Sequence, residues 1–416
     1  MNPLRCFVLR FAVAFATATL TVGVASAQTA FTSGNLVVLR IADRTASTAQ
    51  AVQIQEYTTS TTSLGTALQS IIIPSSTESN KFTVANSVAV AGNLTLNPNN
   101  TITFAGYRAS SGDSSPVTVS SATVNRAIGS LNLTTGVVNT NVSLSGAYNG
   151  LTFRSVATSN GQTFYLSGAG GTTAAASGAG QIATVTGGLP DTVTTLSSTT
   201  ALTTDFRDGL RHIQVANGNL FVSSSSSTFG QQVFQVGTGL PTTGSQTLRE
   251  SFGTQGLSNA YNSFALARLG TGTSWNGTGY DTIYAVDNNN AAGSSVQKWS
   301  FDGTSWMAAG NISLSGVNHI AIRQNSAASV DLFVTTQTPT VLTLSTIQVL
   351  TDTTGFGNSL SGSFNTILTG TGNEGFLGIA YYTPVPEPTT VLAISAATVA
   401  LVGAVRRRWR GEPVLA

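Results

Sequence analysis

Two histidines and two arginines are the residues of this chain best suited to chemistry. His212 and His319 are the only histidines, so a nucleophile could take its base from nowhere else, and the many serines stand at no recognisable spacing from either. Both histidines fall on apolar alternating runs, and Arg154 and Arg211 occupy similar positions in such runs. Together in a channel, the four side chains would form an anion or uronic-acid site. The simpler interpretation, which we favour, is polar residues lining a wet channel.

The acidic residues point more to turns than to chemistry. Asp205 and Asp208 flank Arg207, and paired carboxylates can act as acid and base on a glycosidic bond, but this close spacing in a loop is more typical of a solvated turn. Asp281, Asp287 and the run 288–290 (Asn-Asn-Asn) offer oxygen ligands for calcium, without the invariant Gly and closing Glu of an EF-hand. We therefore expect no metal site, no cofactor and no enzymatic activity.

Aromatic residues gather in one stretch of the sequence. Trp275, Tyr280, Trp299 and Trp306 could stack on sugar rings, although aromatic side chains also fill the sheets of β-rich folds. Asp302-Gly303, between the last two tryptophans, is typical of a hairpin tip because this pair tolerates the backbone of a tight turn. Sugar binding by Trp275, Trp299 and Trp306 is thus a hypothesis beside the plainer one of sheet packing.

The composition predicts the elements that must position these residues. The chain has 416 residues, with 63 Thr, 48 Ser and 43 Gly but only 8% charged residues, and 41% of it is apolar. Abundant Thr, Val, Gly and Ser favour many short strands joined by tight turns, and argue against a helical bundle or a disordered chain. The only cysteine, Cys6, lies near the N-terminus, so the body 28–383 cannot form a disulfide.

The body repeats one strand pattern. Alternating apolar runs flank Asn160-Gly161 and Asn217-Gly218, and Asn-Gly between such runs predicts a hairpin with a type I′ turn. Related second strands start near Phe164, Leu220, Ile283 and Leu332, which gives spacings of 56, 63 and 49 residues. A unit of this length with about four short strands is typical of a propeller blade.

The repeat predicts an all-β fold, a six-bladed β-propeller with seven blades as the alternative. Inner strands are expected near residues 376, 87, 153, 210, 264 and 319. Phe376 to Tyr381 reads as a first strand without followers and Gly34 to Leu39 as a second strand without a leader, so we expect them to pair and close the ring. A pair of β-sandwiches remains the alternative to a propeller.

Both ends of the chain differ from the body. Residues 1–27 resemble a secretory signal peptide, with Arg5 and Arg10 before an apolar helical run and Ala25-Ser26-Ala27 as the cleavage site. At the other end, the 17 residues 389–405 carry no charge and would span ~26 Å as a transmembrane helix. A cluster follows that would stay cytoplasmic and orient the helix: Arg406, Arg407, Arg408 and Arg410. Outside the two ends, 12 basic residues face 14 acidic ones, so no basic patch suggests nucleic-acid binding.

The C-terminal segment 384–416 resembles a known sorting signal. Val385, Pro386, Glu387 and Pro388, then the apolar helix, then the arginines, are similar to the PEP-CTERM signal of bacterial exosortase substrates. The resemblance implies processing at or near the Pro-Glu-Pro motif by exosortase, after removal of the signal peptide by signal peptidase. It also implies transient anchoring in the inner membrane and a cell-surface or extracellular location, typically in bacteria that make exopolysaccharide. The alternative is an anchor that is never cut.

The body is also similar to a group of secreted PEP-CTERM proteins with propeller-like bodies, through stretches such as 220–225, 236–243, 296–300 and 378–380. No biochemical activity is implied by that resemblance. We therefore expect a noncatalytic surface or matrix protein associated with exopolysaccharide. The alternatives are a carbohydrate-binding propeller and, less favoured, a polysaccharide hydrolase or lyase.

Overall fold

The computed structural model describes residues 29–43, 48–85, 92–169, 181–185, 189–202, 209–225, 230–252, 260–288, 293–337 and 345–383. Several predicted features lie outside these ranges: the signal peptide 1–27, the segment 384–416 with its motif, helix and arginines, the candidates Asp205, Arg207 and Asp208, residues 289–290, and the inner strand expected near residue 87. Within the described ranges the fold is all-β, with the short 3-10 helix η1 (Trp275–Gly277) as its helical turn. No helix there is long and apolar enough to span a membrane.

Four sheets contain four strands each. Their strand orders are β13-β11-β10-β9, β14-β15-β16-β17, β18-β19-β20-β21 and β22-β23-β24-β25, and the neighbours are antiparallel. The strands are β9 (Phe153–Thr158), β10 (Thr163–Gly168), β11 (Gln181–Thr184), β13 (Thr200–Ala201), β14 (Leu210–Ala216), β15 (Asn219–Ser224), β16 (Val233–Val236), β17 (Leu248–Glu250), β18 (Tyr261–Ala267), β19 (Thr282–Asp287), β20 (Ser295–Phe301), β21 (Trp306–Ser313), β22 (Val317–Ser326), β23 (Ser329–Gln337), β24 (Ser345–Asp352) and β25 (Asn365–Thr369).

The remaining strands form one ten-stranded sheet in the order β12-β8-β7-β6-β4-β2-β1-β26, with β3 paired to β2 and β5 paired to β6. Its strands are β1 (Leu36–Ile41), β2 (Ala49–Tyr57), β3 (Gln69–Ile72), β4 (Thr83–Ala85), β5 (Thr95–Leu96), β6 (Thr101–Tyr107), β7 (Arg126–Asn132), β8 (Val138–Leu144), β12 (Thr194–Leu196) and β26 (Gly375–Tyr381). Strand β12 runs parallel to β8, whereas the other described pairs are antiparallel.

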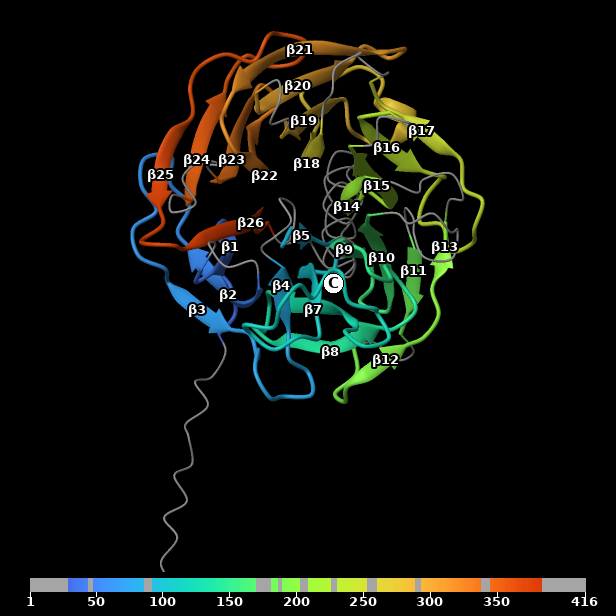
Figure 1. Cartoon of the computed structure of the whole chain (residues 1–416). Coiled ribbons are helices and arrows are strands. Elements are labelled where there is room, and N and C mark those ends of the chain that lie inside the picture. The colour runs from blue at the N-terminus through green and yellow to red at the C-terminus, as the bar shows by residue number, and fades with distance from the viewer. Residues whose placement is uncertain are drawn as a thin grey trace, which may run out of the picture.

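The sheets are arranged around a common centre, which gives the molecule a propeller-like appearance (Figure 1). Strands β9, β14, β18, β22 and β26 lie toward the middle, and β17, β21 and β25 lie toward the rim (Figure 1). Among the described strands, β5 pairs with β6 alone.

Hydrophobic side chains are buried between successive sheets. One cluster joins Phe221 of β15 to Phe264 of β18, and another joins Val38 of β1 to Phe333 of β23. All four side chains are almost fully inaccessible to solvent. Burying a side chain of this size stabilises a fold by about 1.5–3 kcal/mol, so contacts between neighbouring sheets supply much of the stabilisation.

The two ends of the body pair with each other, as the sequence predicted. Strand β1 is antiparallel to β26 from Leu36 opposite Tyr381 to Ile41 opposite Gly375. The ion pair between Arg40 and Glu374 adds a side-chain link beside this ladder. The pairing removes one exposed sheet edge, which matters for a body that has no disulfide.

The two predicted Asn-Gly turns differ. Asn217 and Gly218 have φ of 44° and 69° and form the two-residue link between β14 and β15, which confirms a type I′ turn. At the other site only Gly161 has positive φ, at 73°, and the link from β9 to β10 is longer. Asn160 Oδ1 there accepts the N–H groups of Gln162 and Thr163, so the asparagine stabilises the turn through its side chain instead.

Candidate functional site

Polar side chains at the inner strands form a network at the centre of the fold. It comprises Thr95 of β5, Ser155 of β9, His212 of β14, Ser263 of β18 and His319 of β22, all buried. Each of these residues belongs to the innermost described strand of its group, and the four on β9, β14, β18 and β22 are each the third residue of their strand. Three of them accept a backbone N–H from the following inner strand: Ser155 from Ile213 at 3.3 Å, Ser263 from Ile320 at 3.4 Å, and His319 from Ile379 at 3.3 Å.

The hydrogen bonds of His212 define its tautomer by donor count. The Thr95 hydroxyl donates its single hydrogen to the carbonyl of Ile213 at 3.1 Å, so it accepts from His212 Nε2 at 3.3 Å. Because the neutral ring then carries its hydrogen on Nε2, Nδ1 accepts the hydrogen of the Ser263 hydroxyl at 3.3 Å, and Ser263 Oγ in turn accepts the Ile320 N–H. Both ring nitrogens of the neutral imidazole therefore have a hydrogen-bond partner. Burial lowers the pKa of His212 from 6.5 to about 3.

His319 is neutral for a related reason. Its Nδ1 accepts the Ile379 N–H, so Nε2 carries the proton, and Nε2 has no hydrogen-bond partner among the described residues. Burial, together with the nearby His212, holds the pKa of His319 well below its usual value of 6.5. The two imidazole rings are 5.0 Å apart between centroids. Both rings are thus desolvated and hydrogen-bonded to neighbouring inner strands.

The histidines line a small central cavity. Its volume is about 100 Å³, and Thr95, Gln214 and Tyr381 contribute to the same wall. A space of this size holds a few water molecules, whereas ligand pockets have typically about 300–1,000 Å³. This cavity is therefore too small for a sugar residue.

The two arginines of the predicted anion site do not belong to this cavity lining. Arg154 donates from Nη1 to the carbonyl of Leu210 at 2.9 Å, across to the inner strand of the next sheet. Arg211 donates from Nε to Ser225 Oγ at 2.8 Å. The structure thus brings the two histidines together and directs both arginines to neighbouring main-chain and hydroxyl groups. An anion site made by all four residues stays a prediction.

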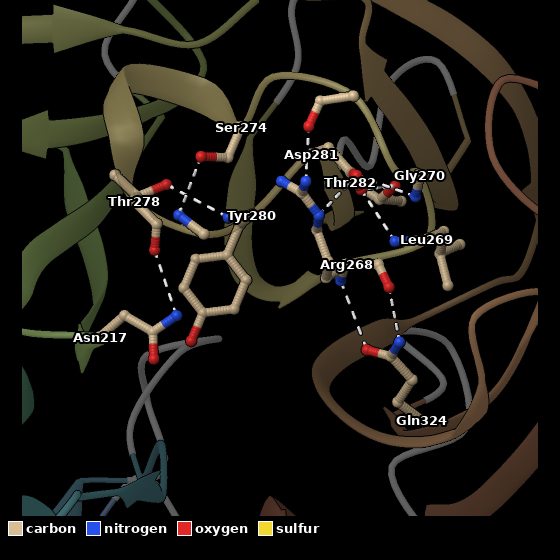
Figure 2. Close-up of polar contacts among 12 residues, drawn as sticks. Asn217, Arg268, Leu269, Gly270, Ser274, Thr278, Tyr280, Asp281, Thr282 and Gln324 are labelled. Atoms are coloured by element: carbon tan, nitrogen blue, oxygen red, sulfur yellow. Dashed lines mark hydrogen bonds and ion pairs between the residues drawn. The ribbon is translucent and has the colours of Figure 1, made fainter.

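Asp281 organises a loop, as expected of a turn residue. Its carboxylate accepts the N–H groups of Leu269 and Gly270 at 2.9 and 2.8 Å, and it forms an ion pair with Arg268 Nε at 3.3 Å (Figure 2). The side chain of Gln324 then joins β22 to the main chain of Arg268 (Figure 2). Every strong acceptor of Asp281 is therefore used within the protein.

Asp287 also serves the main chain, accepting the Ala260 N–H at 2.9 Å. In the part of the chain that the structure describes, no group of three or more His, Cys, Asp or Glu residues is arranged to hold a metal ion. Asp302 Oδ1 accepts the N–H groups of Thr304 and Ser305 in the link between β20 and β21, and Gly303 has a φ of 106°. The hairpin tip predicted at Asp302-Gly303 is confirmed.

The tryptophans pack against protein. Trp275 and Trp299 are only 2% and 4% exposed, and Trp306 is half-buried. The Trp299 ring stacks on Phe252 at 4.2 Å, and Trp275 meets Trp306 edge to face at 5.4 Å. Because their faces are covered, these rings fill the spaces between sheets, and sugar stacking at this place stays a prediction.

Three buried charged side chains were not predicted from the sequence. Lys298 and Asp352, both fully buried, form an ion pair at 2.8 Å, and Tyr284 donates its hydroxyl to the same carboxylate at 2.6 Å. Arg126, with no exposed surface, donates instead to main-chain carbonyls, among them that of Tyr148 at 2.7 Å, and lies over the ring of Tyr107. In the sequence, each appears only as a single charged residue within an apolar run. Their partners could not be predicted, because these lie far away along the chain.

Comparison with known proteins gives no family. No family model matches the chain, and no curated protein matches it either. Among solved structures, TolB from Acinetobacter baumannii is similar with a TM-score of 0.44 and 10% identity, covering 83% of this chain and 67% of TolB. A mutant of AofleA from Arthrobotrys oligospora has a TM-score of 0.43 and 10% identity, covering 85% of this chain and 92% of that chain. Similarity at this level carries no argument about function.

Proposed function

We propose that this chain is an exported, noncatalytic protein of the bacterial cell surface or extracellular matrix, associated with exopolysaccharide. Signal peptidase would remove residues 1–27, and exosortase would cut at or near residues 385–388. The helix 389–405 and the arginines that follow it would hold the body in the inner membrane until that cut.

The noncatalytic assignment rests on one observation: both histidines serve the scaffold. His212 uses both ring nitrogens on neighbouring hydroxyls, and His319 uses Nδ1 on a main-chain N–H. Both are buried, and the cavity that they line, about 100 Å³, is too small for a sugar residue. A base for hydrolysis or elimination would need a ring nitrogen free to take a proton from a substrate.

The mass of the protein in native cells tests the export pathway. Membrane, surface and medium fractions are separated, and the intact mass of the protein is measured in each. A surface or matrix form that lacks both the signal peptide and the residues after the Pro-Glu-Pro motif supports the proposal. A membrane form that still contains Arg406 to Arg410, with no shorter form elsewhere, would contradict processing by exosortase.

We further infer that the body is a six-bladed β-propeller. The four separate sheets would be four blades, β26-β1-β2-β3 the fifth and β5-β6-β7-β8 the sixth. The antiparallel pairing of β26 with β1 and the similar strand order in each group support this count. Seven blades are the alternative. Averaged electron-microscopy images viewed along the axis should show six lobes, and seven would contradict the count.

A polysaccharide hydrolase or lyase is the competing function through His212 and His319. Turnover of uronic-acid polymers by the purified chain, lost in a folded His212→Ala variant, would overturn the noncatalytic assignment. Carbohydrate binding without catalysis is the second candidate. A second, polar cavity of about 380 Å³, lined by residues such as Asn125, Ser143 and Thr195, favours it because it is large enough for one sugar residue.

A further inference from the structure

The first described residues of the chain lie beside the link between β7 and β8. The Phe31 N–H donates to the carbonyl of Leu133 at 2.8 Å. A Cβ at Gly136 of the same link would lie 2.2 Å from the Thr29 carbonyl oxygen, so this link packs directly on the first described residue. Figure 1 places β1, β2 and β3 next to the region of β7 and β8. The N-terminal residues 29–35 therefore run along one end of these strands.

The last described residues lie at the same end. Tyr382 donates its main-chain N–H to the carbonyl of Asn35 at 2.9 Å and accepts the Gly34 N–H at 2.8 Å. Glu56, a buried residue at the end of β2, fixes this region, because its carboxylate accepts the side-chain amide of Asn35 at 2.6 Å. Thr383, the last described residue, thus follows directly after an anchored position. One face of the molecule carries both points at which the body joins the segments 1–28 and 384–416.

The links around these two points carry no charged residue. They join strands at the same end as residues 35 and 382, and comprise residues 58–68, 97–100, 133–137, 327–328 and 353–364. Together with residues 29–35 and 382–383 we name them the terminal face. At the opposite end of the same strands, the links carry Asp43, Glu78, Lys81, Arg108, Asp113 and Glu374. Farther from the two chain ends, the side of the terminal face also carries Arg268, Asp281 and Asp302, of which the first two pair with each other.

Two exposed apolar side chains flank the N-terminal residues on the terminal face. Leu68 and Val137 are 58% and 52% exposed. Leu68 precedes Gln69, whose side chain accepts the Thr29 hydroxyl at 2.7 Å, and Val137 follows Gly136, which packs on the same threonine. Exposed apolar side chains beside a membrane segment can bury themselves in the interface of a bilayer.

The proposed membrane segments begin close to this face. Residues 384–388 separate Thr383 from the proposed helix 389–405, and five residues reach at most ~18 Å. Residues 25–28 separate Thr29 from the apolar run 11–24 and reach at most ~14 Å. The headgroup layer itself is about 5–8 Å deep on each side of a bilayer. The terminal face is therefore the part of the body nearest to the lipid while either segment is in the membrane.

We propose that the terminal face docks on the outer phospholipid surface of the inner membrane while the chain is anchored there, with Leu68 and Val137 in the headgroup region. An uncharged face is not repelled by anionic headgroups. The two apolar side chains add to the attraction, because binding to a bilayer surface grows with the apolar area that is buried. This inference rests on the proposed export and anchoring, and it adds the orientation of the body on the membrane.

Fluorescence quenching by lipid tests the docking. The full chain with Cys6→Ser is reconstituted in nanodiscs whose phospholipids carry a nitroxide on the headgroup. Thr61→Cys and Thr77→Cys are matched labelling sites, because both change exposed threonines in the links that flank β3, the first on the terminal face and the second at the opposite end. We expect the nitroxide to quench a fluorophore at residue 61 and to leave one at residue 77 unquenched.

Negative charge on the two apolar residues separates docking from simple tethering. Leu68→Glu combined with Val137→Glu should abolish the quenching at residue 61, because carboxylates are repelled by anionic headgroups and the apolar contact is lost. Ile72→Glu, which changes a 71% exposed side chain at the other end of β3, should leave the quenching intact. Urea unfolding establishes that each variant is folded.

Equal quenching at residues 61 and 77, or quenching at residue 61 that survives both glutamates, would overturn the docking. A fluorophore at residue 61 that responds to dextran but not to lipid would also overturn it, since the face would then bind glycan. A chain that enters the nanodiscs but is not quenched refutes the docking alone. A chain that does not enter them refutes the membrane anchor and the docking together, so the two failures are distinguishable.

Discussion

Acidification should destabilise this protein through its two central histidines. In the folded chain the pKa of His212 is about 3, whereas an exposed histidine in the unfolded chain titrates near 6.5. The unfolded chain therefore binds more protons over this interval, and stability falls as the pH is lowered from 6.5 toward 3. At about pH 5, His212 alone should lower the free energy of unfolding by about 2 kcal/mol relative to neutral pH. His319 shifts in the same direction and should add to this loss.

Urea unfolding at about pH 7.5 and about pH 5 measures the effect as a change in the free energy of unfolding. His212→Ser is the informative variant because serine occupies the corresponding position in β9 and β18, as Ser155 and Ser263. Between the two pH values, the free energy of unfolding of this variant should fall by about 2 kcal/mol less than that of the parent. Phe264→Leu, which reduces packing beside the ring but keeps the histidine, should retain the full pH dependence.

An equal loss of stability in the parent and in His212→Ser would refute the reasoning. Such a result would mean that His212 is protonated in the folded chain or is not buried there. Carboxylates that titrate in the same range contribute alike to both proteins, so the difference between them reports His212 together with its effect on the neighbouring His319.

Three substitutions test other contacts. Lys298→Met should lower the free energy of unfolding by about 3–5 kcal/mol, because Asp352 stays buried without its cation. Adding Asp352→Asn should recover part of the lost stability. No recovery in the double variant would argue against the ion pair. Arg126→Lys should lower the free energy of unfolding in urea by about 3 kcal/mol or more, since one ammonium group cannot reach all the carbonyls that accept from the guanidinium. The same variant should be cleaved faster by proteases within residues 115–125. A cleavage rate like that of the parent would contradict this role of Arg126. Gly378→Ala should lower the melting temperature and reduce the free energy of unfolding by about 1–3 kcal/mol, because the new Cβ would lie 2.3 Å from the Gly92 carbonyl oxygen. Gly272→Ala is the control, since a Cβ there meets nothing within 4 Å. Equal effects of the two substitutions would exclude a steric clash as the cause.

Local sequence patterns predicted the strands well. The strands expected near Phe164, Leu220, Ile283 and Leu332 correspond to β10, β15, β19 and β23. These four strands are buried along almost their whole length, so both of their faces are covered. The pairing of the first and last strands was also predictable, since each lacked a partner in its own repeat. The Asn160 turn was not, because Asn-Gly is compatible with more than one loop length and neighbouring hydrogen bonds decide among them.

The candidate site was predicted only in part. Periodicity placed His212 and His319 on inner strands, and the structure confirms that they lie on β14 and β22. Whether such a side chain is accessible depends on what the other inner strands place opposite it. Thr95 and Ser263, far away in the sequence, supply the hydroxyl groups that occupy His212.

The sequence by itself determined the all-β class, the approximate repeat and the turn at Asn217-Gly218, because strand alternation and tight turns are set by residues within a few positions of one another. Its terminal motifs carry the export prediction without reference to any fold. Only the tertiary structure decided that both histidines are desolvated, that His212 has a partner for each ring nitrogen, and that Trp275 and Trp299 are covered by neighbouring side chains. Burial, pKa and hydrogen-bond satisfaction depend on groups that meet in space from distant parts of the chain, and no local pattern specifies which groups those are.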